Sequence, residues 1–162
     1  MAGSTGTKVA QRESAIIHCK VYLSAILDLY NRRIVAYVIG DRNDNPLVYK
    51  TFGKAVKANP GAHPLFHSDR GFQYTNRTFH HKLTKAGMTQ SMSRVAHCID
   101  NGPMEGFWGI LKRERYYGRR FTSKQELVHM IESFIRYYNT RRVQRNLGVL
   151  TPMEKHELGL AA

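Results

Sequence analysis

The stretch that decides the fold runs from residue 67 to residue 112. It opens with HSDRG (67–71) and closes with DNGPMEGFW (100–108), and thirty-five residues separate Asp69 from Glu105. Two carboxylates that distant sequence positions bring together on rigid elements are what a divalent-metal site for phosphoryl transfer needs. The spacing alone is weak evidence in a chain with twelve acidic residues, so the residues around the pair carry the argument.

The neighbouring residues predict where each carboxylate lies. Asp69 comes soon after the apolar pair at 65–66, so we expect it just past the end of a strand, where Gly71 lets the chain turn away. Pro103 suits the first turn of a helix with Asp100 or Asn101 as its cap, which places Glu105 in the first turns.

The Glu105 helix also carries an apolar stripe, formed by Met104, Phe107, Trp108 and Leu111. Lys112 follows Glu105 by seven residues, two turns away on nearly the same face. A carboxylate and a lysine stacked in this way suit a site that a phosphate backbone passes. The plain alternative, that Lys112 is one of many solvated lysines, has equal weight.

Charge is the informative property of the whole chain. Its 162 residues carry 25 Lys or Arg and 12 Asp or Glu, a net charge of +13, which predicts an anionic partner. Residues 112–145 contain ten Lys or Arg and three Glu, interleaved with aromatics. Ribosomal proteins share this balance, so it indicates polyanion binding and no more. No membrane span, signal peptide, disulfide framework or metal-ligand spacing is expected, and a reducing cytosolic setting is the default.

Apolar periodicity and turn residues predict an alternation of strands and helices. A predicted capping box, Ser123 to Glu126, opens a helix whose inward residues are Leu127, Met130, Ile131, Phe134, Ile135 and Tyr138. The earlier predicted elements are strands at 21–31 and 34–39, a helix at 45–56, a strand at 64–68, a helix at 75–85, a short strand at 88–92 and a loop at 93–101.

The motifs at 67–71 and 100–108 resemble the catalytic core of OrfB-type insertion-sequence transposases. Three further stretches share this resemblance: YLSAILDLYNRRIV (22–35), YYN to Arg142 (137–142) and NLG to TPME (146–154). These transposases belong to the DDE transposase and retroviral integrase superfamily. The resemblance covers residues 20–157. It implies an α/β, RNase H-like fold, a five-stranded mixed sheet flanked by helices. Residues 1–20 are then an altered N-terminal strand region, 21–157 the core and 158–162 a tail.

The resemblance also implies chemistry and partners. In intact relatives three carboxylates hold two Mg²⁺ or Mn²⁺ ions about 3.5–4 Å apart for strand cleavage and strand transfer. Asp69 and Glu105 match two of these ligands. The expected partners are double-stranded DNA (transposon ends and target) and further copies of the chain, in the bacterial cytoplasm and on the nucleoid when bound. The predicted DNA contacts are Lys112, Arg113, Arg115, Arg141, Arg142 and Arg145.

The first catalytic Asp of the family has no counterpart in this sequence. Counting back from Tyr22 puts its Thr-Asp-Val-Thr-like tetrad at 7–10, where Lys8 takes the place of the Asp, and no Asp precedes Asp28. A lysine there removes an anionic ligand and adds a repelling ammonium, so metal binding is expected to be weak or lost. Asp28 is the nearest substitute carboxylate, although a structural role is favoured for it.

Three functions therefore remain open. The first is a DDE transposase core with impaired strand transfer, and whether it is an enzyme at all depends on the third ligand. The second is an inactive remnant that only binds DNA or oligomerises, favoured by Lys8 and by the lack of room for a helix-turn-helix region before the core. A general RNase H-type nuclease is the third; it needs the same acidic first strand and lacks the family-specific ending.

Overall fold

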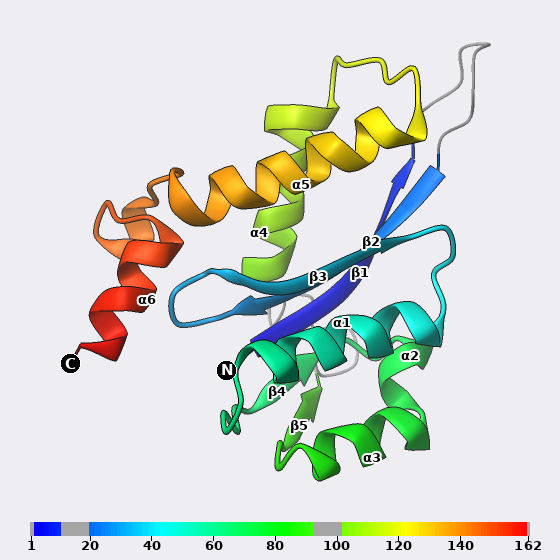
Figure 1. Cartoon of the computed structure of the whole chain (residues 1–162), viewed down its shortest axis with the longest axis vertical. Helices are drawn as coiled ribbons and strands as arrows, with labels where there is room; N and C mark the ends of the chain where they lie inside the picture. The colour runs from blue at the N-terminus through cyan, green and yellow to red at the C-terminus, as the bar shows by residue number, and fades with distance from the viewer. Residues whose placement is uncertain (1, 11–19, 93–101, 162) are drawn as a thin grey trace.

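A five-stranded mixed sheet forms the centre of the computed structural model, which describes residues 2–10, 20–92 and 102–161 (Figure 1). The strand order is β3-β2-β1-β4-β5. An antiparallel meander is formed by β1 (Ala2–Ala10), β2 (Lys20–Asp28) and β3 (Ile34–Gly40). The short strands β4 (Phe66–Ser68) and β5 (Gln90–Met92) extend the sheet in parallel with β1. The predicted α/β fold with a five-stranded mixed sheet is confirmed, and β1 is its central strand.

Helices cover both faces of this sheet (Figure 1). One face carries α1 (Asn45–Ala58), α2 (Phe72–Thr75) and α3 (Arg77–Lys85). The other carries α4 (Gly102–Leu111), which continues into a π-helical turn, η2 (Lys112–Tyr116), and α5 (Lys124–Thr140). A 3₁₀ turn, η3 (Arg145–Leu147), and α6 (Pro152–Leu160) complete the chain. None of the described helices is long and apolar enough to cross a membrane.

Successive side chains of β2 point to opposite faces of the sheet, and this divides the core into two layers. Its odd-numbered residues, Val21, Leu23, Ala25 and Leu27, are buried with the apolar residues of α4 and α5. Ile26, which points the opposite way, belongs to a second cluster with residues of α1 and α3. Every residue of α5 that was predicted to face inward is buried. The stripe predicted for α4 is buried too, each member at 5% exposure or less.

Two helix starts differ from the prediction. The helix predicted at 75–85 is α3, which begins two residues later at Arg77, because Asn76 has an extended backbone and its side chain accepts a hydrogen bond from Phe79 N at 2.9 Å; the separate short helix α2 ends at Thr75. The predicted capping box at Ser123 is only half correct. Ser123 accepts from Glu126 N, but the Glu126 carboxylate accepts from Thr122 N at 2.8 Å and so does not reach back to the cap residue.

The β2–β3 turn is tied to the C-terminal helices by two asparagines. Asn139 on α5 accepts a hydrogen bond from Ile34 N at 2.9 Å and donates one to Ile34 O at 3.0 Å. Asn31 donates to the Asp28 carboxylate at 2.8 Å and lies 3.2 Å from His156 Nδ1 on α6. Because the Asn31 amide nitrogen is a donor, His156 Nδ1 is the group that can accept this bond.

Candidate functional site

Asp69 directly follows the last residue of β4, as predicted. Its Oδ1 accepts a hydrogen bond from Gly71 N at 2.9 Å, and the side chain is half-buried. A Cβ at Gly71 would lie 2.9 Å from this Oδ1 and 3.1 Å from Gln73 Oε1, so only glycine fits the turn without a shift of its neighbours. One oxygen of Asp69 thus fixes the turn, and the other is the one left for a ligand.

Glu105 lies in the first turn of α4 and is exposed. The packing of its helix fixes its position: Phe107 makes edge-to-face contacts with Trp108 and Tyr138, both with ring centroids 5.0 Å apart. The predicted caps of this helix, Asp100 and Asn101, and the predicted loop 93–101 lie outside the described residues.

The central strand β1 lies between the two carboxylate-bearing elements. It pairs in parallel with β4 on one side, and α4 contacts it from one face of the sheet. Asp69 and Glu105 therefore flank the same strand. In the described ranges, no three His, Cys, Asp or Glu side chains come together as a group that could hold a metal ion. Asp69 and Glu105 therefore stay predicted ligands, and the described residues add no third carboxylate to them.

The register of β1 shows which of its positions lies beside Asp69. Ser4 pairs with Ser68, so Thr5 is level with Asp69, about 4.8 Å away across the two strands. Lys8 pairs with Tyr22 on the other side of β1, three residues farther along. At about 3.3 Å per residue this places the Lys8 backbone roughly 10 Å beyond the level of Asp69.

Asp28 is engaged in the turn after β2. Its two oxygens accept hydrogen bonds from Tyr30 N at 2.9 Å and from the Asn31 amide at 2.8 Å. Asp28 pairs with Ala2 of β1, which in turn pairs with Phe66 of β4, three residues before Asp69. Asp28 and Asp69 are thus two strands and three residues apart, which corresponds to about 14 Å between their Cα atoms. The structural role favoured for Asp28 agrees with this geometry, and a cation shared with Asp69 does not.

The six basic residues predicted to contact DNA differ in their solvent exposure and in their interactions with other side chains. Arg113, Arg141 and Arg145 are exposed, whereas Lys112 is half-buried at the start of the π-helical turn. Arg115 lies over the ring of Tyr137, 5.4 Å from its centroid. Arg142 forms a two-pronged ion pair with Glu114, at 2.8 Å from Nη2 and 3.0 Å from Nε, and this hydrogen bonding raises the pKa of Arg142. Arg142 is therefore partly neutralised.

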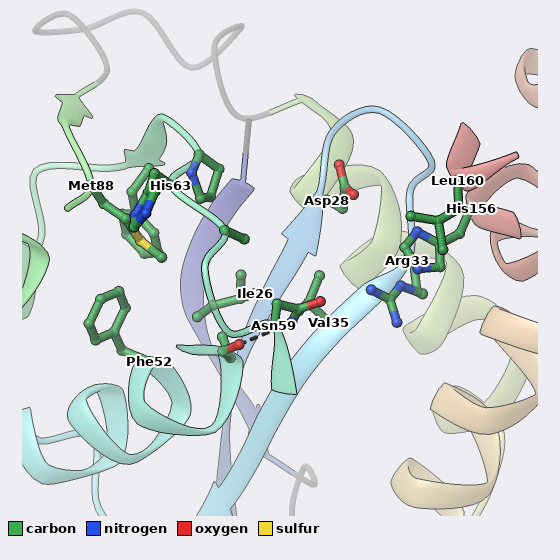
Figure 2. A pocket seen from close by; sticks show the side chains of 14 residues that line it. Ile26, Asp28, Arg33, Val35, Phe52, Asn59, His63, Met88, His156 and Leu160 are labelled. Atoms are coloured by element: carbon green, nitrogen blue, oxygen red, sulfur yellow. Dashed lines mark hydrogen bonds between the residues drawn. The ribbon is translucent and has the colours of Figure 1, made fainter. Parts of the chain in front are cut away.

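Other hollows of the surface lie apart from the carboxylates. An apolar pocket of about 360 Å³ has Ile26, Val35, Phe52 and Met88 in its wall and is rimmed by polar groups that include Asp28, Arg33, His63 and His156 (Figure 2). Neither Asp69 nor Glu105 lines it. A basic hollow beside α5 is lined by Arg115, Arg119 and Arg120. Arg119 and Arg120 were not among the predicted DNA contacts, although their place in the basic segment 112–145 was a signal.

Comparison with known proteins identifies the family of the chain. Two family models, both described as integrase core domain, match residues 6–98 and 86–152. The chain belongs to the integrase core family. It is 39% identical over 143 residues to InsK, the transposase assigned to insertion sequence element IS150 in Escherichia coli K12, covering 88% of this chain and 50% of that protein. An uncharacterized transposase-like protein of Haemophilus influenzae is 40% identical over 134 residues, covering 83% of this chain and 62% of that one. This member of the family thus spans about half to three-fifths of the length of these relatives.

Solved integrase cores share its fold. The HTLV-2 integrase catalytic core domain in complex with magnesium superposes with a TM-score of 0.65 at 14% identity, covering 95% of this chain and 94% of that one. The catalytic core domain of BIV integrase gives a TM-score of 0.68 at 15% identity, covering 99% and 95%. The predicted RNase H-like, integrase-type fold is confirmed, as is the resemblance to insertion-sequence transposases.

Proposed function

We propose that this chain is the core of an insertion-sequence transposase that binds duplex DNA and whose metal-dependent strand transfer is impaired. The supporting observation is the pair Asp69 and Glu105, which flank β1 while residues 2–10 supply no carboxylate of their own. A relative's core has been solved with magnesium, and relatives have been solved as a dimer, a trimer and an intasome. We extend metal dependence, DNA as substrate and self-association to this chain as part of the proposal.

Among the described residues, no third carboxylate joins Asp69 and Glu105 to complete a magnesium site. Magnesium prefers octahedral oxygen coordination and gives up its waters reluctantly, so an incomplete set of ligands holds it weakly. With Asp69 and Glu105 as its carboxylates in the described part of the chain, the proposed site has two anionic ligands for a function that uses three. A lysine near the pair would weaken metal binding further through charge repulsion.

Two aspartate substitutions test where the third ligand is missing. Counting back from Tyr22 favours position 8 and the β1 register favours position 5, so Lys8→Asp and Thr5→Asp are to be compared by calorimetric titration with Mg²⁺ and Mn²⁺. The original chain is expected to bind weakly, and one of the two variants at least tenfold more tightly. Asp69→Asn added to that variant should abolish the gain. If neither variant gains affinity, the Asp69–Glu105 site assignment is wrong.

DNA binding is supported by the unpaired positive charge of residues 112–145. Of their ten Lys and Arg side chains, only Lys124 and Arg142 form ion pairs within the described part of the chain, with Asp41 and Glu114. Anisotropy of a labelled duplex across a salt series tests it, because each phosphate contact contributes a slope of about −0.9 in log affinity against log salt. Binding that does not weaken with salt would refute the electrostatic basis.

The second candidate, a DNA-binding or oligomerisation module without chemistry, is favoured by the same incomplete ligand set. A strand-transfer assay with a labelled transposon end separates the two. Residual joining that disappears in Glu105→Gln supports an impaired enzyme. Salt-sensitive DNA binding with no joining, in the original chain and in both aspartate variants, supports the module.

A further inference from the structure

A groove beside Glu105 has the chemistry of an anion site. It has a volume of about 500 Å³ and lies between the first turns of α4, the β2–β3 turn and the segment after α5. Three arginines line it, Arg32, Arg142 and Arg145, and none of the described carboxylates does. Arg142 already has Glu114 as a partner, so Arg32 and Arg145 provide the charge that no described acidic side chain balances.

Arg32 is held in this groove by an unusual backbone. Its φ is +62°, the left-handed region that asparagine and glycine adopt more readily than arginine, and its N–H donates to Asp28 O at 2.8 Å. Its Nη1 is fully buried and has no hydrogen-bond partner among the described residues. A buried guanidinium nitrogen without a hydrogen-bond acceptor is costly. An anion in the groove supplies negative charge next to the Arg32 guanidinium.

The walls of the groove leave room for a ligand at the surface of α4. Gly102 and Gly106 are exposed, and a Cβ added at either would meet no atom within 4 Å. Deeper in, burial raises the pKa of the Tyr138 hydroxyl, and Gln144, Arg142 and Arg32 oppose this rise. The positive potential of two arginines therefore reaches the floor of the groove as well as its rim.

We propose that this groove binds a phosphate of the nucleic-acid strand that passes Glu105, with Arg32 and Arg145 as its ligands. This inference rests on the proposed function and adds to it a specific contact outside the carboxylate pair. Gly106 is the residue next to Glu105 on α4, so the groove begins one residue away from the carboxylate. Arginine's planar fork suits the oxygens of a phosphate, and bare glycine surface lets a sugar-phosphate backbone approach the helix closely.

Two kinds of variant test the groove, one by charge and one by space. Arg32→Asn removes the guanidinium but keeps a residue that tolerates the left-handed backbone, and Arg145→Gln removes the second cation. Gly106→Leu fills the groove, removes no charge and places a better helix former in the helix. Arg77→Gln is the matched control, an exposed arginine on α3 that does not line the groove. Unfolding midpoints confirm that each variant is folded.

The readout is anisotropy of a labelled duplex from 50 to 200 mM salt. Loss of one phosphate contact lowers the salt slope by about 0.9, so the variant-to-original affinity ratio changes about 3.5-fold over this range. We expect this change for Arg32→Asn and for Arg145→Gln, weaker binding for Gly106→Leu, and neither effect for Arg77→Gln. If the original chain binds duplex but folded Arg32→Asn and Gly106→Leu bind equally well with the same slope, the groove proposal is overturned and the proposed function stands. If the original chain does not bind duplex, the proposed function itself fails.

Two competitors identify the source of the anion. Inorganic phosphate should compete with duplex only at millimolar concentrations, and a single-stranded oligonucleotide at far lower ones. Phosphorus-31 NMR titration measures the binding of inorganic phosphate directly. If phosphate binds as tightly as the oligonucleotide and this binding depends on Arg32, the groove is a free-phosphate site and the assignment to a nucleic-acid strand is overturned.

Discussion

Asn139 offers a quantitative test of how the fold is held at its open edge. β3 is an edge strand, and the N–H and C=O of Ile34 at its start both bond to the Asn139 side chain, at 2.9 and 3.0 Å. The amide thus takes the place that a peptide group of a further strand would occupy. We expect Asn139→Ala to leave both backbone groups of a 4%-exposed residue without their partner.

The magnitude follows from the two bonds. Each contributes about 0.5–1.5 kcal/mol net, so their joint loss should lower the free energy of unfolding by about 2 kcal/mol. For a chain of this size that corresponds to a fall of roughly 4–8 °C in Tm. Urea and thermal unfolding followed by circular dichroism measure both quantities. Gln125→Ala, an exposed position on the same helix, is the control and should stay within about 0.5 kcal/mol.

Asn139→Asp separates hydrogen bonding from shape. Aspartate has nearly the same size and still accepts from Ile34 N, but its second oxygen faces Ile34 O, so two acceptors oppose each other. This variant should be at least as unstable as Asn139→Ala at pH 7. It should recover partly in acid, relative to Asn139→Ala, because the protonated carboxyl can donate to Ile34 O. A variant as stable as the original chain at pH 7 would refute the two-bond account.

Other predictions concern packing, capping and the Asp69 turn. Phe107→Ala should lower the free energy of unfolding by about 3–5 kcal/mol, measured in urea, because a fully buried ring between Trp108 and Tyr138 leaves a cavity; a loss below 1 kcal/mol would contradict this packing. Hydrogen bonds from Thr151 lower the pKa of Glu154. The Glu154 carboxylate therefore stabilises the fold at a pH above the ordinary glutamate pKa, and this stabilisation is lost as the pH falls through the lowered pKa of Glu154. Thermal scans from pH 7 to pH 3 should therefore show a smaller acid-induced loss in Glu154→Gln than in the original chain. Gly71→Ala should displace the Asp69 carboxylate and reduce any metal affinity gained by the better β1 variant; unchanged affinity would show that the turn tolerates a Cβ.

Sequence periodicity predicted the helices well because burial decides them. The stripe of α4 and the six inward residues of α5 follow from apolar spacing alone, and the structure buries all of them. Asp69 was predicted for the same kind of reason, since an apolar strand followed by a glycine turn is a local pattern. These features need no knowledge of distant residues.

Features that depend on pairing could not be predicted in the same way. The segment AGSTGTKVA (2–10) has no apolar alternation to fix a register, so counting from Tyr22 selected Lys8, whereas pairing with β4 brings Thr5 level with Asp69. The reach of Glu126 to Thr122 depends on side-chain geometry that the capping pattern does not contain. Arg32 was not among the predicted DNA contacts, because its place in the groove arises where three separate segments meet.

Binding and chemistry rest on different parts of this fold. The groove is built from α4, the β2–β3 turn and the segment after α5, and its wall includes the contact of Phe107 with Tyr138, although α4 also contacts β1. The chemistry that we propose, in contrast, needs a third carboxylate, which we expect on β1. If the chain lacks this carboxylate, as we propose, the groove residues that we expect to bind DNA are still present. Restoring an acid on β1 should raise metal affinity and leave metal-free duplex affinity nearly unchanged, and a parallel change in both would mean that the two functions share one site.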